Sequence, residues 1–342
     1  MQLGDVQVNF LQSLVLAIED CQIDPWPLFT EFGLEDLLDS HPERRISIPR
    51  YMRLGYKAIQ LTQREDIGLL MGEKTQAHHF GLLGFCAQSA ENLEQALTVF
   101  IEFEKLFSQN SRGHSQILKT ESHTGFQFYS ISPYNPYNLF VVDAFFAGWL
   151  NLLKTFVGKQ NLDLSGARVD IEFDAPNYAA SYESWNIPVN FSQENNVLWL
   201  PHSLCQQRNP LANPISYQQI RQICQQQLNK LKQGQNISQQ VAELIAMKLT
   251  GQTPNLKDIA SDLHVESWTL KRRLQDEGNS FKNLLDDTRK ALATRYIRDT
   301  ALSLGEISYL MGFSAPVAFQ RAFKRWHGIA PGLYRQQAKL RN

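Results

Sequence analysis

The stretch that decides the fold of this 342-residue chain is GFSAPVAFQRAFKRWHGIAPGLYR, which runs from Gly312 to Arg335. A buried helix rarely carries so many charges, and a solvent-exposed helix rarely carries so many rings. Phe319 and Phe323 lie four residues apart, so they share one face of a helix. The aromatic side chains are expected to face the core, whereas the basic ones are left for a partner: Arg321, Lys324, Arg325 and Arg335.

The same layout occurs a second time upstream. The stretches NLKDIASDLHVESWTLKRRLQDEG and SLGEISYLMGFSAPVAFQRAFKRWHG share one pattern. Asn255 with Asp258 has the spacing of a capping box, and Ser303 with Glu306 has the same spacing. Each copy is therefore expected to begin with a short, N-capped helix.

The two copies differ by one residue near their turn. Ile259 and Ile307 are 48 positions apart, whereas Leu270 and Phe319 are 49 apart. A short helix, a tight turn and a second helix make a helix-turn-helix. We therefore expect two such motifs and a linking helix, at about 255–278, about 303–328 and about 280–299.

In a helix-turn-helix the second helix enters the major groove with its N-terminal residues toward the bases. In the first copy this helix is expected to begin near Glu266 and to expose Trp268, Thr269, Lys271 and Arg272. In the second copy we expect it to begin at Ser314 as the N-cap and to expose Val317, Ala318 and Arg321. The second surface is smoother, which predicts weaker base readout there.

The charge is unevenly distributed along the chain. Residues 251–342 hold 15 Lys and Arg against 9 Asp and Glu, while residues 1–250 hold 18 against 25. A basic segment joined to an acidic one predicts that the C-terminal part meets a polyanion such as DNA. The chain shows no run of about 18 apolar residues and no secretory leader, so we expect a cytoplasmic protein with no membrane span.

The remaining candidate chemistry is sparse. Four widely spaced cysteines predict neither a zinc ribbon nor a disulfide framework. The adjacent pair His78 and His79 is a poor metal site, because neighbours on a regular element do not point at one ion. No nucleotide-binding loop, G-x-S-x-G or H-E-x-x-H occurs, so we expect no cofactor, no metal and no enzymatic activity.

The N-terminal half alternates helical and strand-like patterns. GFQFYSI, ARVDIEF and NNVLWLP read as strands, and NLFVVDAFFAGWLNLLKTFVG reads as a buried helix. The fold class is therefore an α+β N-terminal domain followed by an all-α C-terminal domain with tandem helix-turn-helix motifs. The expected boundaries are 1–209 for the first domain, 210–236 for a Gln-rich helical linker and 237–342 for the second domain. Residues 215–233 are either a packed connector or a homodimerisation helix.

The region from Phe126 to Phe156 is rich in aromatic side chains. Most of these rings belong to a core, but apolar pockets with a few polar groups are also how ligand sites are built. Tyr129, Tyr134 and Trp149 combine a ring with a hydrogen-bonding group, and Arg112 suits an acidic ligand. These four are the candidate effector-binding residues.

The C-terminal third resembles the AraC/XylS family of transcription regulators, on the strength of DIASDLHVESWTLKRRLQDEGNSFKNLLDDTR and LSLGEISYLMGFSAPVAFQRAFKRWHGIAPGLYR. The N-terminal stretches HFGLLGFCAQSAENLEQAL and YESWNIPVNFSQENNVLWLPHSLCQQRNPLANP resemble the arabinose-binding-like effector domain of its ornithine-utilisation-regulator-like branch. The resemblance implies promoter DNA as a partner, RNA polymerase where the protein activates, and a small-molecule effector. It implies base contacts from Trp268, Lys271, Arg272, Pro316, Val317, Ala318 and Arg321.

The function expected is a sequence-specific DNA-binding transcription regulator under effector control. Two alternatives stay open from sequence. One is a regulator of the same family that needs no effector. The other, from a different class, is a metabolite-binding or enzymatic protein whose helical C-terminal domain docks a protein.

Overall fold

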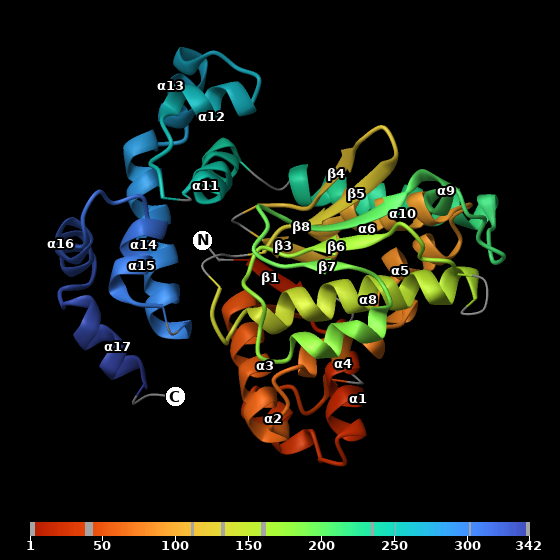
Figure 1. Ribbon diagram of the computed structural model, residues 1–342. Helices are drawn as coiled ribbons and strands as arrows, with labels where there is room; N and C mark the ends of the chain where they lie inside the picture. The colour runs from red at the N-terminus through yellow and green to blue at the C-terminus, as the bar shows by residue number, and fades with distance from the viewer. Residues whose placement is uncertain are drawn as a thin grey trace.

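The computed structural model describes residues 4–37, 44–110, 113–130, 134–158, 162–233, 236–249, 251–300 and 302–339. An N-terminal domain of mixed helices and strands lies beside a C-terminal domain built from helices (Figure 1). The predicted fold class is confirmed.

The strands of the N-terminal domain form two sheets. The smaller sheet has the order β2-β1-β3, from β1 (Gly4–Gln7), β2 (Arg45–Ser47) and β3 (Ser108–Asn110). The larger has the order β4-β5-β8-β6-β7, from β4 (Gln116–Lys119), β5 (His123–Phe128), β6 (Arg168–Asp170), β7 (Val189–Asn190) and β8 (Asn196–Pro201). All pairs are antiparallel except β6 with β7. The three strands predicted from the sequence are confirmed as β5, β6 and β8.

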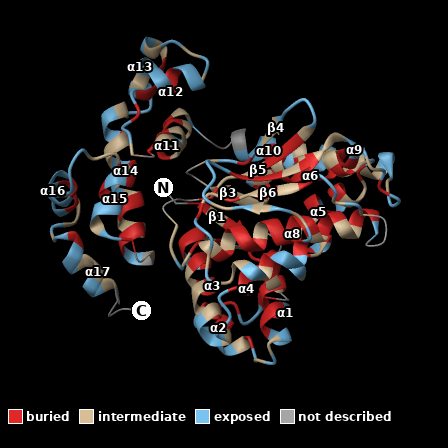
Figure 2. Ribbon diagram, viewed as in Figure 1, coloured by how far each residue is buried: buried red, intermediate tan, exposed pale blue. Residues whose placement is uncertain are grey.

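Helices pack around these sheets. They are α1 (Gln12–Asp20), α2 (Trp26–Glu31), α3 (Ile48–Thr62), α4 (Ile67–Glu73), α5 (Leu82–Gln88), α6 (Leu93–Glu102), α7 (Glu104–Phe107), α8 (Leu139–Val157) and α9 (His202–Cys205), with 3-10 turns η1 (Asn9–Leu11), η3 (Ala77–Phe80) and η4 (Ala179–Trp185). The helix α8 lies at the centre and is mostly buried (Figure 2). By length and composition alone α8 would pass as a membrane span, although Asp143 and Lys154 interrupt its apolar sequence, and its apolar surface is used in the domain core.

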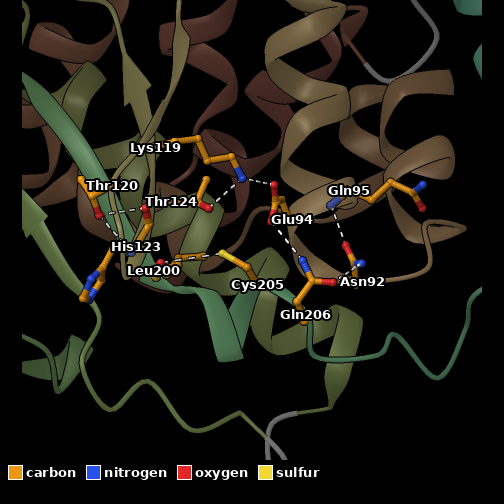
Figure 3. A network of polar contacts seen from close by, with 10 residues as sticks. All are labelled: Asn92, Glu94, Gln95, Lys119, Thr120, His123, Thr124, Leu200, Cys205 and Gln206. Carbon is orange, nitrogen blue, oxygen red and sulfur yellow. Dashed lines mark hydrogen bonds and ion pairs between the residues drawn. The ribbon is translucent and has the colours of Figure 1, made fainter.

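Polar contacts fix the first turn of α6 (Figure 3). Lys119 of β4 forms an ion pair with Glu94 and donates a 3.0 Å hydrogen bond to the Thr124 hydroxyl on β5. Gln206, just after α9, donates to the other Glu94 oxygen at 3.2 Å. These bonds join α6, the β4–β5 hairpin and the end of α9.

The Gln-rich segment forms α10 (Pro214–Gln233), which packs on α5. Leu228 of this helix is buried, whereas Ile223 and Leu231 are exposed. Cys224 of α10 is also buried. The helix therefore packs on the N-terminal domain through one side and leaves apolar side chains on the surface.

The C-terminal domain consists of α11 (Ile237–Lys248), α12 (Leu256–Asp262), α13 (Ser267–Asp276), α14 (Phe281–Asp299), α15 (Leu304–Leu310), α16 (Pro316–His327) and α17 (Pro331–Lys339). The long helix α14 is the centre of this domain and touches α11, α15, α16 and α17. It also touches α3, so the two domains meet along these helices. One hydrophobic cluster continues from the N-terminal helices into the C-terminal ones.

Candidate nucleic-acid interface and ligand cavity

The first helix-turn-helix consists of α12 and α13. Asn255 accepts a hydrogen bond from the backbone N–H of Asp258, and the Asp258 side chain reaches back to the N–H of Asn255. His264 has a φ of 53°, which is the left-handed conformation that ends α12 and turns the chain. Leu270 and Leu274 are buried, so the opposite side of α13 faces outward.

The second motif consists of α15 and α16 and has the same construction. Ser303 and Glu306 form the predicted capping box, and Gly312 takes the left-handed conformation with a φ of 67°. The N-cap of α16 is Ala315, so the expected N-cap at Ser314 was wrong. Pro316 explains the shift, because its fixed φ suits the first helical position and keeps the preceding residue extended.

The positions of the turns account for the one-residue difference between the copies. The left-handed residues His264 and Gly312 are 48 apart, whereas the N-caps Glu266 and Ala315 are 49 apart. The extra residue thus lies inside the turn of the second motif. This confirms the repeat that the sequence predicted.

The outer side of α13 presents a ring and several cations. Trp268 is 65% exposed, and the Arg272 guanidinium lies 5.6 Å from the centre of its ring. Lys271 is exposed and Thr269 is half-buried. The Arg272 contact with the indole holds the guanidinium over a flat surface, which restricts the directions it can point.

The outer side of α16 is smoother. Val317 is 57% exposed, and the side chains around it are also exposed: Pro316, Ala318, Arg321 and Lys324. Arg325 is exposed and lies 3.6 Å from Asp286 of α14. The apolar side chains on this surface offer no hydrogen bonds, which leaves the basic side chains as its hydrogen-bond donors.

Arg335 was expected to face the polyanion, and the structure shows otherwise. Its guanidinium donates to the carbonyl oxygens of Ile297 at 3.2 Å and Leu302 at 2.5 Å. It therefore satisfies backbone acceptors near the end of α14. Burial lowers its pKa.

Arg289 on α14 was missed at the sequence level. It donates to the carbonyl oxygens of Met311 (2.8 Å) and Gly312 (3.1 Å) and to the Thr253 hydroxyl (2.5 Å). Its guanidinium also lies 4.6 Å from the ring centre of Phe313. Arg289 thus fixes the turn of the second motif against the linking helix. The sequence held a signal for this role, because Arg289 lies four positions after Leu285 and three before Leu292, on the apolar side of the linking helix.

The N-terminal domain contains a partly open cavity of about 90 Å³, several times the ~10–15 Å³ that one water molecule needs. Its lining is mostly apolar and comes from both sheets and from the helices between them: Val6, Phe10, Ile48, Tyr51, Met52, Met71, Thr75, Phe80, Phe100, Ile101, Glu104, Phe107, Ser108, Asn110, Ser115, Phe128, Tyr129, Ser130, Val141, Ala144, Phe145, Gly148 and Trp149. Phe128 and Phe145 stack with ring centres 3.6 Å apart.

The four candidate effector residues are not all brought together. Tyr129 and Trp149 line the cavity. Tyr134 does not, because its hydroxyl donates to Glu172 at 2.5 Å and accepts from Asn196 at 2.6 Å. Arg112 lies outside the described residues.

Glu104 was also missed from sequence, although it lines the cavity. It lies on α7 and accepts hydrogen bonds from the Ser115 backbone N–H (2.9 Å) and hydroxyl (2.7 Å). Burial raises the pKa of its carboxyl, and the bonds from Ser115 partly offset that effect. The signal in the sequence was the i+4 spacing from Phe100, which places Glu104 on the apolar face of the preceding helical pattern.

Within the described residues, no group of three metal-ligating side chains occurs at the histidine pair or elsewhere. His79 is buried and its Nδ1 accepts a hydrogen bond from the backbone N–H of Gln76. Burial, with a smaller contribution from His78, lowers the pKa of His79 to about 4. It is therefore a neutral acceptor at the start of η3.

Comparison with known proteins agrees with this construction. Residues 23–209 match the arabinose-binding domain of AraC transcription regulators, and residues 259–337 match a helix-turn-helix domain family. The chain belongs to the AraC family of transcription regulators. The ornithine utilization regulator of Pseudomonas aeruginosa is 26% identical over 97% of this chain and 96% of its own. The regulator VirS of Mycobacterium tuberculosis is 25% identical over 98% of each chain. The crystal structure of CdpR from Pseudomonas aeruginosa is similar at 21% identity, a TM-score of 0.47, and coverage of 95% of this chain and 97% of that one.

This AraC-family protein is a DNA-binding transcription regulator, with its helix-turn-helix domain at the C-terminal end. Its family and its relatives are regulators rather than enzymes. The alternative of an enzyme with a protein-docking C-terminal domain is thereby set aside.

Proposed function

We propose that both helix-turn-helix motifs of this regulator contact one DNA duplex, and that a small effector in the N-terminal cavity controls how they are presented. The observation that carries the DNA part is the paired construction of α12–α13 and α15–α16, each with buried leucine or phenylalanine on one side and exposed side chains on the other.

In the first motif we propose that Trp268, Thr269, Lys271 and Arg272 reach base edges. Arg272 suits the O6 and N7 acceptors of guanine, while the Trp268 ring and the Thr269 methyl group can pack on thymine methyls. The contact between Arg272 and Trp268 supports a shared, partly preorganised surface.

In the second motif we propose base-edge contacts from Pro316, Val317, Ala318 and Arg321, with Lys324 and Arg325 on phosphates. Only Arg321 of the first four offers side-chain hydrogen bonds. The second motif should therefore discriminate between sequences less than the first one does.

For the effector we propose the cavity as the site, with Tyr129 and Trp149 among its contacts. Arg112 and Tyr134 stay predictions. The Pseudomonas aeruginosa relative is named for ornithine utilization, but ornithine carries two ammonium groups and a carboxylate. Glu104 is the single charged side chain that the described residues bring to the lining, so we do not extend ornithine to this chain.

We also propose a dimerisation partner, a polymerase partner and a location for this protein. A homodimer could form through 215–233, where α10 exposes Ile215, Ile223 and Leu231. RNA polymerase would be a partner where the protein activates, and the cytoplasm is the proposed location. The predicted domain boundaries (1–209, 210–236 and 237–342) stay predictions.

The experiment that tests the DNA proposal is selection of binding sites with the full chain, followed by affinity measurements at two salt concentrations. Two conserved blocks about 34 Å apart are expected if both motifs enter successive major grooves on one face. The logarithm of the affinity should fall by about 0.9 per neutralised phosphate as the logarithm of salt rises. One conserved block would make the second motif a backbone clamp. No enrichment would contradict the DNA proposal.

A further inference from the structure

The cavity has one charged group in an apolar surrounding. Among the described residues that line it, Glu104 is the only acid and there is no Lys, Arg or His. A lone carboxylate facing an apolar space repels anionic ligands and favours a cation or a strong hydrogen-bond donor.

The Glu104 carboxylate has acceptor capacity left. One oxygen accepts from the Ser115 N–H and the other from the Ser115 hydroxyl. An ionised carboxylate offers about four lone-pair positions, so each oxygen keeps one for a further donor. The two bonds to Ser115 also hold the carboxylate in place before a ligand arrives, which lowers the cost of binding.

Aromatic rings near the cavity add a second preference. Phe107 lies three residues after Glu104 on the same short helix. Phe145 and Trp149, which also line the cavity, are neighbours with their ring centres 4.4 Å apart. Rings attract cations through their faces, and this attraction is larger in a desolvated site. The same rings provide the apolar contact that a hydrocarbon ligand needs.

A further polar group in the lining is not fully used. The Ser130 hydroxyl is buried and, within the described residues, makes no hydrogen bond of ordinary geometry, although it lies near the Tyr134 hydroxyl. Buried polar atoms usually have a partner. A bound molecule with a donor or acceptor near this end of β5 would supply one.

We propose that the cavity takes an apolar amine, that is, a small aliphatic or arylalkyl molecule whose protonated nitrogen binds the Glu104 carboxylate. This inference rests on the proposed effector function and names the chemical class of the effector. The hydrocarbon part lies against Phe128, Phe145 and Trp149, and the ammonium group takes the free lone pairs of Glu104.

The test compares ligands of one length that differ only in the head group. Hexylamine, 1-hexanol and hexanoate are titrated calorimetrically into the full-length protein near pH 7, where the amine is protonated. Hexylamine is expected to bind about tenfold or more tightly than 1-hexanol, because a charge-assisted hydrogen bond is roughly twice as strong as a neutral one. Hexanoate is expected to bind weakest of the three.

Two variants and one control locate the effect. Glu104→Gln keeps the size and an acceptor for Ser115 but removes the charge, so hexylamine should fall to about the affinity of 1-hexanol while 1-hexanol is unchanged. Ala144→Met fills the cavity with a flexible side chain and should weaken all ligands. Glu121→Gln changes the net charge equally on the exposed surface and should behave as the unaltered protein does.

The outcomes separate the ligand class from the effector function. Equal binding of the amine and the alcohol, sensitive to Ala144→Met, would reject the amine and keep the cavity as an effector site. Tighter binding of hexanoate would overturn the inference and favour the role predicted for Arg112. If Glu104→Gln leaves the affinity for hexylamine unchanged, Glu104 only holds Ser115 and the inference fails. Binding of none of the three compounds would also overturn the inference. DNA selection is independent of all these results.

Discussion

Lys105 of α7 and Glu243 of α11 form an ion pair between the two domains, with 3.6 Å between Nζ and Oε2. Lys105 follows Glu104, so one four-residue helix carries a side chain into the cavity and another onto the first helix of the C-terminal domain. Arg45 of β2 donates to the carbonyl oxygen of Leu106 at 2.9 Å, which fixes the end of this helix. A ligand that moves α7 would therefore change a contact with α11.

Reversing one charge of this ion pair should weaken the coupling between the cavity and DNA with little effect on stability. The Lys105 and Glu243 side chains are 50% and 35% exposed, so the pair contributes at most about 1 kcal/mol. We expect Lys105→Glu to move the ratio of DNA affinities with and without hexylamine toward one. The double variant with Glu243→Lys should restore the ratio. An unchanged ratio in both variants would show that coupling takes another route, such as the contact between α3 and α14.

Removing the basic side chains one at a time should separate base readout from phosphate contact. Arg272→Ala is expected to cost about 1–3 kcal/mol on the selected site and to relax the preference at one base pair. Lys324→Ala should weaken binding on all sequences and reduce the salt slope by about one. Gln337→Ala, on the exposed surface of α17, serves as the control. Competition binding with matched and mismatched duplexes measures both effects, and a uniform loss for Arg272→Ala would assign Arg272 to the backbone.

The tandem motifs were predictable because their signals are local. A capping box, a buried i, i+4 pair and a turn residue lie within about 25 positions of each other, and each depends on short-range sterics and hydrogen bonds. The left-handed residue in the turn of the second motif is a glycine, Gly312. In the first motif it is His264, whose left-handed conformation only the alignment of the two copies suggests. Pro316 shows the limit of such signals, because its effect on the preceding residue moved the N-cap by one position.

The roles of Arg335 and Glu104 were not predictable in the same way. Nothing near Arg335 in sequence shows that it bonds to carbonyl groups of residues 297 and 302, more than thirty positions away. The cavity around Glu104 is assembled from strands and helices between residues 6 and 149. Both roles depend on tertiary packing, for which a single sequence gives little information. Charge alone, therefore, indicated a polyanion partner but not which arginine meets it.

Adding one methyl group at Gly312 should destabilise the C-terminal domain. A Cβ atom there would lie 2.8 Å from the Gln252 carbonyl oxygen and 3.1 Å from the Thr253 hydroxyl, at a φ of 67° that side chains disfavour. We expect Gly312→Ala to cost about 2 kcal/mol or more in the free energy of unfolding. Gly332→Ala is the matched control, since its Cβ meets nothing within 4 Å in the exposed first turn of α17, and it should stabilise by up to about 1 kcal/mol. Urea denaturation of both variants measures the contrast, and equal effects would contradict this account of the turn.

Asp143 should make the stability of the N-terminal domain fall as the pH rises toward neutrality. This carboxylate is fully buried on α8 and accepts hydrogen bonds from the hydroxyls of Tyr178, at 2.7 Å, and Tyr182. Burial raises its pKa to about 7 from an ordinary value of 3.8, against the opposing effect of the two tyrosines. Between these values the folded protein holds a proton that the unfolded chain has released. The free energy of unfolding should thus decrease from about pH 4 to about pH 7 and then level off.

Replacing Asp143 with Asn tests that sign. Asn keeps an acceptor for one tyrosine and a donor for the other but does not titrate, so Asp143→Asn should lose the part of the pH dependence that this carboxylate causes, on the order of 3 kcal/mol between pH about 5 and about 8. Denaturation at pH about 5 and about 8 gives the difference for each protein, and subtracting the two differences cancels the other titrating groups, including His79. Asp276→Asn, at an exposed position on α13, should show the same pH dependence as the unaltered chain. A pH dependence that Asp143→Asn leaves intact would mean that the carboxylate stays ionised between its two tyrosines.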